Sequence, residues 1–192
     1  MKKHAKKRQL RKIRKWIAVA VLLVLILIFA PKLVRRGMEL LHPRPYQALV
    51  RREAREFGLE EDLVYAVIKC ESGFDPEAIS RADAHGLMQL TQHTFEWVSS
   101  IYPPEKGGGD VLDVENNVHC GCALLRILLD EYGTRREALA AYNAGMGNVS
   151  NWLADERYSA DGRTLHTIPF PETEAYVDRV EETLEMYRRL AA

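Results

Sequence analysis

Apolar residues recur three and four positions apart through most of residues 46–192, and this spacing predicts amphipathic helices. Tyr46, Leu49, Val50, Ala54 and Phe57 set the pattern, and later segments repeat it. The expected helices cover residues 46–57, 60–71, 92–98, 114–129, 135–142, a short segment ending at Leu153, and 171–187. No stretch alternates apolar and polar residues over the length of a strand. The pattern therefore predicts an all-α fold built on one core.

Residues that favour helix ends mark the boundaries of these segments. Gly133 follows the last apolar position of one helix and can adopt the left-handed conformation of a C-terminal cap. Asp113 is expected to cap the N-terminus of the same helix, and Thr134 with Glu137 fits a capping box for the next one. Pro171 suits the first turn of the last helix.

The N-terminal segment differs in composition from the rest. Its first 36 residues hold 12 of the 27 Lys and Arg and no Asp or Glu. Residues 16–30 carry no charge, and a helix over residues 16–34 would rise about 28 Å, close to the thickness of a hydrocarbon core. We expect a basic cytoplasmic segment at 1–15, a transmembrane signal anchor at 16–34, a juxtamembrane linker at 35–45 and a globular domain at 46–192.

A cleaved signal peptide is the alternative interpretation of this segment, because its apolar region has a similar length. The sequence Phe29-Ala30-Pro31-Lys32 contains no small-x-small cleavage site and places a proline where cleavage would occur. Under either interpretation, residues 37–192 lie outside the cytoplasm.

The formal net charge of zero is unevenly divided along the chain. Residues 37–192 hold the other 15 Lys and Arg and all 27 Asp and Glu, which gives them a net charge of −12. Nucleic acid requires a basic face, so we expect no nucleic-acid partner for this domain. The basic N-terminus is expected to face anionic lipid instead.

Glu71 is the first candidate for chemistry. It is expected at the end of the second helix, with Ser72 and Gly73 directly after it. A carboxyl group at a helix C-terminus, among apolar neighbours, has its ionised form disfavoured. Such a group can stay protonated near neutral pH and act as a general acid. A solvated surface glutamate is the simpler alternative.

Three further patterns support the chemical interpretation. The first is Glu71-Ser72 with Phe74-Asp75-Pro76, Ser80 and Gly86-Leu87-Met88-Gln89, and the second is Ala141-Tyr142-Asn143-Ala144-Gly145 with Asn117-Val118 and Gly121 upstream. The third is Ile168-Pro169-Phe170-Pro171-Glu172-Thr173 with Tyr176-Val177. Together, in this order across residues 46–190, they resemble the catalytic domain of the soluble lytic transglycosylases, a lysozyme-like family (glycoside hydrolase family 23) that cleaves peptidoglycan glycan strands.

The resemblance implies a membrane-anchored peptidoglycan lytic transglycosylase in which Glu71 is general acid and then base. Glu71 would protonate the oxygen of the MurNAc–GlcNAc β-1,4 bond and then deprotonate the muramic 6-hydroxyl, leaving a 1,6-anhydromuramyl end. The acetamido group of the substrate would assist, so no second carboxylate is required. No metal and no organic cofactor is implied.

The resemblance also implies a set of substrate contacts. They are Ser80, Met88, Gln89, Tyr142, Asn143, Glu172 and Tyr176. Met88 and Tyr176 have an alternative role as core residues, because methionine fills gaps well and Tyr176 lies on the apolar face of its predicted helix.

This sequence departs from the family pattern at two places. Asp83-Ala84-His85 stands where the family usually has Gly-Ala, so Asp83 is a candidate second carboxylate, with a turn aspartate as the simpler alternative. Thr91-Gln92 replaces the usual apolar–proline pair, which puts glycan contacts there in doubt. His85 and His93 lack an evident third metal ligand.

Cys70, Cys120 and Cys122 are expected on the oxidising side of a membrane, where one disulfide can form. Cys120 and Cys122 are about 200° apart on a helix and are not expected to pair. One of them can face Cys70, or all three can remain buried thiols.

Two other functions remain open on the sequence alone. A lysozyme-like hydrolase would share the fold and leave reducing ends. A non-catalytic glycan-binding scaffold in a cell-envelope assembly would bind the same strands without turnover.

Overall fold

The computed structural model describes residues 2–105 and 109–191, and for residues 2–14, 17–22 and 24 it describes the backbone alone. The described chain divides into two compact units, residues 1–43 and 44–192. The first contains one helix, α1 (Lys2–Leu41), with Pro31 inside it.

No described helix has both the length and the hydropathy needed to cross a membrane. The side chains of residues 17–22 and 24, which belong to the anchor expected at 16–34, lie outside the described residues.

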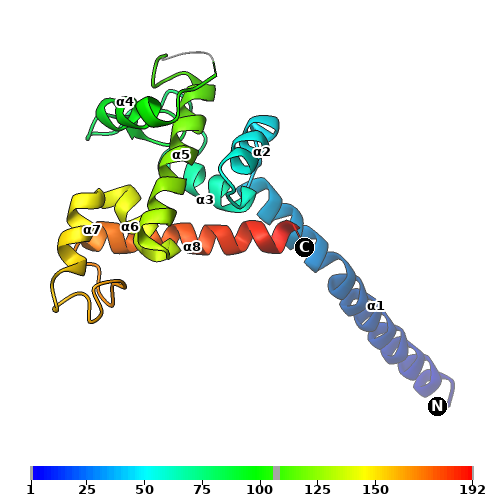
Figure 1. Cartoon of the computed structure of the whole chain (residues 1–192). Helices are drawn as coiled ribbons and strands as arrows, with labels where there is room; N and C mark the ends of the chain where they lie inside the picture. The colour runs from blue at the N-terminus through cyan, green and yellow to red at the C-terminus, as the bar shows by residue number, and fades with distance from the viewer. Residues whose placement is uncertain (1, 106–108, 192) are drawn as a thin grey trace. The chain divides into compact units, whose positions relative to one another are not determined.

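The second unit is mostly helical, as predicted, and contains one short strand pair that was not predicted (Figure 1). Its helices are α2 (Gln47–Glu56), α3 (Glu61–Ser72), α4 (Gln92–Ile101), α5 (Val114–Tyr132), α6 (Arg135–Ala144), α7 (Met146–Leu153) and α8 (Pro171–Ala191). Two short antiparallel strands, β1 (Ala84–His85) and β2 (Leu90–Thr91), pair Ala84 with Thr91 and His85 with Leu90. Strands of two residues are too short to leave an alternating pattern in the sequence.

Most of the expected helix ends are confirmed. The Asp113 side chain accepts a hydrogen bond from the Asn116 amide at 3.0 Å and caps α5, which ends at Gly133 with a φ of 71°. The capping box at Thr134 is wrong. The Thr134 hydroxyl donates to the Glu137 carboxylate, and that buried carboxylate also accepts from the Leu165 amide at 2.8 Å. Glu137 therefore holds the loop before α8 instead of capping α6.

Helix α5 supplies the centre of the core. All ten residues from Asn116 to Leu125 are buried, and α2, α4 and α6 pack against this helix. Helix α8 packs against α3 and α6 (Figure 1). Tyr176, Val180 and Leu184 lie on its buried face. Helices α3 and α8, which both contribute to the candidate site described below, are therefore in direct contact.

The loop between β1 and β2 lies directly on α5. A Cβ atom added to Gly121 would lie 2.3 Å from Met88 Sδ and 2.7 Å from Met88 Cβ. A Cβ atom added to Gly86, which has a φ of 74°, would lie 2.6 Å from Asn117 Nδ2. Both glycines are therefore required by close approach of the loop to the helix.

We expect Gly121→Ala to lower the free energy of unfolding by about 1–3 kcal/mol, because the added methyl group overlaps Met88. Urea unfolding followed by circular dichroism measures the change. Gly147→Ala is the matched control, since its Cβ would meet nothing within 4 Å and alanine favours the helix. Equal stabilities of the two variants would contradict this packing.

Candidate active site

Glu71 occupies the last turn of α3, and the residues after it fix that end of the helix. Gly73 ends α3 with a φ of 61°. The Ser72 hydroxyl lies 2.9 Å from the Leu87 carbonyl oxygen, to which it donates, and it accepts from the Phe74 amide at 3.1 Å. The end of α3 is therefore bound to the loop that follows β1.

The surroundings of Glu71 favour its protonated form. Burial raises the pKa of its carboxyl group to about 7, against an ordinary value of 4.5. The phenol of Tyr176 and the positive charge of Arg179 oppose this rise by stabilising the carboxylate. The Tyr176 hydroxyl is buried beside Glu71 and interacts favourably with the ionised form of its carboxyl group. Glu71 can therefore both donate and accept a proton near pH 7.

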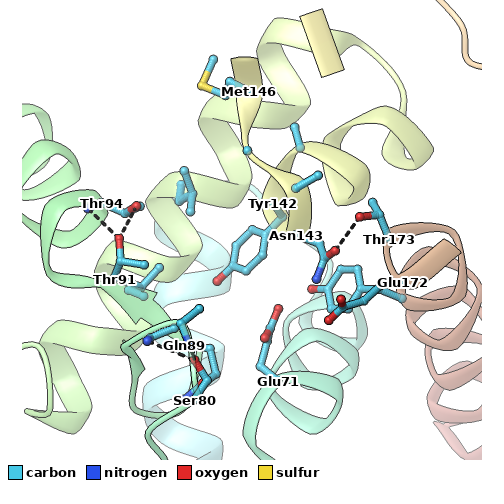
Figure 2. A pocket seen from close by; sticks show the side chains of 18 of the residues that line it. Glu71, Ser80, Gln89, Thr91, Thr94, Tyr142, Asn143, Met146, Glu172 and Thr173 are labelled. Atoms are coloured by element: carbon cyan, nitrogen blue, oxygen red, sulfur yellow. Dashed lines mark hydrogen bonds between the residues drawn. The ribbon is translucent and has the colours of Figure 1, made fainter. Parts of the chain in front are cut away.

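Glu71 opens into a cleft of about 1400 Å³. One wall is formed by α4 and the loop before it, which includes Ser80, Gln89 and Thr91. The opposite wall comes from the end of α6, the start of α7 and the start of α8. Figure 2 shows Thr91 and Thr94 on one side, Asn143, Glu172 and Thr173 on the other, and Glu71 below Tyr142 between them.

Tyr142 and Asn143 are fixed by hydrogen bonds to neighbouring segments. The Tyr142 hydroxyl donates to the Met88 carbonyl oxygen at 2.8 Å, and burial raises the pKa of this phenol well above its ordinary value. The Thr173 hydroxyl donates to Asn143 Oδ1 at 2.8 Å. These bonds join α6 to the β1–β2 loop on one side and to α8 on the other.

Gln89 and Ser80 line the cleft while holding its wall together. Gln89 has a φ of 49°, and its side-chain amide donates to the Ala78 and Gly86 carbonyl oxygens, both at 3.0 Å. The Ser80 hydroxyl accepts from the backbone amides of Ala82 and Ala84. Both side chains therefore have a structural role in addition to their position at the cleft.

The three remaining predicted contacts differ in how exposed their side chains are. Glu172 is exposed at the rim, and Tyr176 is buried but still lines the cleft beside Glu71. Met88 does not line the cleft. Its side chain is fully buried against Gly121. Met88 is therefore a core residue, which was the alternative role that the sequence allowed.

Comparison with known proteins matches this arrangement to one family. The family model described as "Transglycosylase SLT domain" matches residues 48–164, which is more than half of the chain. The chain belongs to this family.

Curated relatives of this chain have the same name. Curated proteins named membrane-bound lytic murein transglycosylase C, from Pectobacterium atrosepticum and Yersinia pestis, are 32% and 33% identical to it over 169 aligned residues. Each alignment covers 75% of this chain and 47% of the relative, so the chain spans about half the length of these relatives.

Solved structures agree on the fold of the SLT domain. The lytic transglycosylase Slt of Pseudomonas aeruginosa, solved as an inactive glutamate-to-glutamine mutant, has a TM-score of 0.70 and 33% identity. The 70 kDa soluble lytic transglycosylase of Escherichia coli has a TM-score of 0.70 and 27% identity. Each match covers 81% of this chain and 26% of the solved chain.

Two residues of the SLT domain site were not assigned a role from the sequence. Asn117 on α5 accepts from the Met88 amide at 2.7 Å and donates to the His85 and Val111 carbonyl oxygens. Arg179 lines the cleft and acts on Glu71. Its position three residues after Tyr176 on the same helix was the only available signal, because charge alone does not distinguish it from other surface arginines.

The departures from the family pattern have local explanations. Asp83 is exposed, has a φ of 59° and forms an ion pair with His85 at 3.0 Å, and it does not line the cleft. It is therefore a turn aspartate. Thr91 caps α4 by accepting from the Thr94 amide, and it also lines the cleft.

Glu53, Glu56 and His119 are the described residues whose ligand atoms lie close enough together to hold a metal ion. They do not line the cleft. Glu53 is already held by Arg52 Nε at 2.7 Å and His119 Nδ1 at 2.8 Å. The group is therefore accounted for as a buried ion pair between α2 and α5.

The three cysteines are free, so of the two alternatives that the sequence left open, a disulfide or three thiols, the structure has the three thiols. Cys70 faces Thr183 on α8 with its sulfur 3.7 Å from the hydroxyl, and Cys120 faces Ser99 on α4 at 3.2 Å. Cys122 is fully buried. The thiols contact different helices, and burial raises the pKa of each.

The raised pKa of Glu71 predicts a stability change that depends on pH. Below pH 4.5, Glu71 is protonated in both the folded and the unfolded chain and costs nothing. Between pH 4.5 and 7 the unfolded chain releases the proton first, so the folded state loses up to about 3 kcal/mol. Glu71→Gln stays neutral and is expected to be more stable than the wild type above pH 7 and equal to it near pH 4.

Urea unfolding of both proteins across this pH range measures the difference. A constant difference between the two proteins at every pH would contradict the raised pKa.

Proposed function

We propose that this chain is a peptidoglycan lytic transglycosylase that cleaves the MurNAc–GlcNAc β-1,4 bond and leaves 1,6-anhydromuramyl ends. The observation that carries the proposal is the half-buried Glu71 carboxyl group, with a pKa of about 7, in a cleft large enough for a glycan strand. The names of the related proteins support the same activity. So does the Glu→Gln mutant of the Pseudomonas aeruginosa enzyme, which is described as inactive.

The proposed reaction uses one carboxyl group twice. Glu71 donates its proton to the glycosidic oxygen as the bond from that oxygen to C1 breaks, and the acetamido oxygen of MurNAc bonds to C1. The Glu71 carboxylate then takes the proton of the 6-hydroxyl, O6 bonds to C1, and the acetamido oxygen leaves. Glu71 ends protonated, so the cycle needs no external proton.

Tyr176 and Arg179 stabilise the ionised form of Glu71 in this proposal. Between the two steps Glu71 is ionised in a half-buried site, which costs free energy. The phenol and the guanidinium both favour the carboxylate. They therefore limit the cost of the intermediate state without removing the acidity that the first step needs.

The proposed substrate contacts are the residues at the cleft surface. They are Ser80, Gln89, Tyr142, Asn143 and Glu172, with Tyr176 beside the acid. Met88 is left out, because its side chain is fully buried.

A hydrolase is the second candidate, and one observation favours keeping it. Glu172 also lines the cleft, so a second carboxylate is available near the substrate. Two carboxylates can activate water and leave reducing ends.

Mass spectrometry of peptidoglycan digested with the full chain tests the reaction. We expect anhydromuramyl ends from the wild type and a loss of at least about 1000-fold in rate for Glu71→Gln, because the amide cannot donate the proton. Asp83→Asn is the matched control, since it makes the same change at an exposed carboxylate outside the cleft, and it is expected to retain activity.

Reducing ends from the wild type would contradict the transglycosylase reaction and support hydrolysis, with Glu172 as the second carboxylate. Binding of glycan without cleavage by the wild type would leave only a scaffold function.

We also propose that residues 16–34 anchor the enzyme in a membrane. Residues 1–15 would then lie in the cytoplasm, residues 35–45 would form a linker, and the catalytic domain at 46–192 would lie outside the cytoplasm. The support is the uncharged stretch from Trp16 to Ala30 behind nine basic residues. The curated relatives are named membrane-bound, which agrees with this arrangement.

Cell fractionation tests the anchor. We expect the full chain in the membrane fraction, resistant to alkaline carbonate extraction, with its original N-terminus. Recovery of a soluble chain that begins near residue 31 would instead indicate a cleaved signal peptide.

A further inference from the structure

Helix α4 forms one wall of the cleft. Helix α4 and its cap contribute Thr91, His93, Thr94 and Trp97 to the cleft, so the lining continues for about two turns of the helix. Figure 2 shows Thr91 and Thr94 on this wall, with Met146 at the far end of the view from Glu71.

The faces of α4 have different partners. Phe95 and Val98 are buried in the core, and Gln92 donates to Glu96 at 2.8 Å at the surface. Trp97 belongs to neither group, because its side chain lines the cleft and remains 38% exposed. An indole left accessible inside a groove is typical of a ligand contact.

The cleft also has an apolar part of its lining, formed by Leu124 and Leu128 of α5 and Met146 of α7. The α4 wall carries no Asp, Glu, Lys or Arg in the cleft, and the charged lining residues Glu71, Arg81, Glu172 and Arg179 come from other segments. An apolar ligand face therefore suits the α4 wall better than a carboxylate or an ammonium group.

A β-1,4-linked glycan strand has such a face. Its pyranose rings present C–H bonds with partial positive charge, which match the negative face of an indole ring. The cleft volume of about 1400 Å³ also exceeds the range of roughly 300–1,000 Å³ that is common for small-molecule sites. There is therefore room for sugars beyond the two that flank the cleaved bond.

We infer that Trp97 is a specificity-determining residue that stacks on a sugar of the strand distant from the cleaved bond, so that the site favours long glycans over short ones. This inference rests on the proposed function, since it assigns the occupant of the same cleft. It concerns binding rather than proton transfer, and the two can be measured separately.

Calorimetric titration of the full chain carrying Glu71→Gln tests the inference, because this background prevents turnover. The probes are β-1,4-linked GlcNAc oligomers of two, four and six sugars. Adding Trp97→Ala is expected to weaken binding of the six-sugar oligomer about tenfold and of the two-sugar oligomer less than about twofold. Trp97→Phe keeps an aromatic face and is expected to retain most of the affinity.

Ile101→Ala is the matched control. Ile101 lies one turn beyond Trp97 on α4, is 49% exposed and does not line the cleft, so its removal is expected to change none of the affinities. An equal loss at every oligomer length, no loss for Trp97→Ala, or no binding of any oligomer by the parent would each overturn the inference.

The two proposals fail in different ways. Length-dependent binding through Trp97 without anhydromuramyl products from the wild type would overturn the reaction alone. Anhydromuramyl products from the wild type, together with oligomer affinities that Trp97→Ala does not change, would overturn the role of Trp97 alone.

Discussion

The burial of one carboxyl group is the constraint on which the site depends. Glu71 lies where α3 ends, α8 packs against that helix, and the cleft opens. Burial alone would make ionisation very costly, and the nearby Tyr176 phenol and Arg179 guanidinium bring the pKa back to about 7. The fold therefore holds a group that is unfavourable for stability when ionised, as expected where function and stability compete.

The loop between β1 and β2 keeps that constraint in place. Asn117 fixes the loop on α5 by accepting from the Met88 amide and donating to the His85 carbonyl oxygen, and Gly121 lets Met88 approach the helix closely. The same loop receives the hydroxyl groups of Ser72 from α3 and Tyr142 from α6. Residues of the family motifs thus serve largely to hold three helices at fixed positions around Glu71.

Local patterns were sufficient to predict much of this molecule. The helical spacing predicts the all-α fold, the cap at Asp113 follows from its side chain, and the motif around Glu71 identifies the candidate acid. Contacts between distant segments were not predictable in this way. Glu137 looked like a cap but holds Leu165, and the cysteines that seemed able to pair face Thr183 and Ser99.

The same limit applies to the cleft. The sequence did not assign Arg179 or Trp97 a role, because only the packing of α8 and α4 brings them to the cleft surface. Likewise, the left-handed backbone of Gln89 could not be predicted from its residue type, which rarely adopts that conformation.

The most direct test of this account is the protonation of Glu71 itself. Carbon-13 NMR of the side-chain carboxyl groups, with the Glu71 signal assigned by its absence in Glu71→Gln, follows this one group through a pH titration. The account predicts a midpoint near pH 7. A midpoint near the ordinary value of 4.5 would contradict it, because Glu71 would then be ionised at neutral pH and unable to donate a proton.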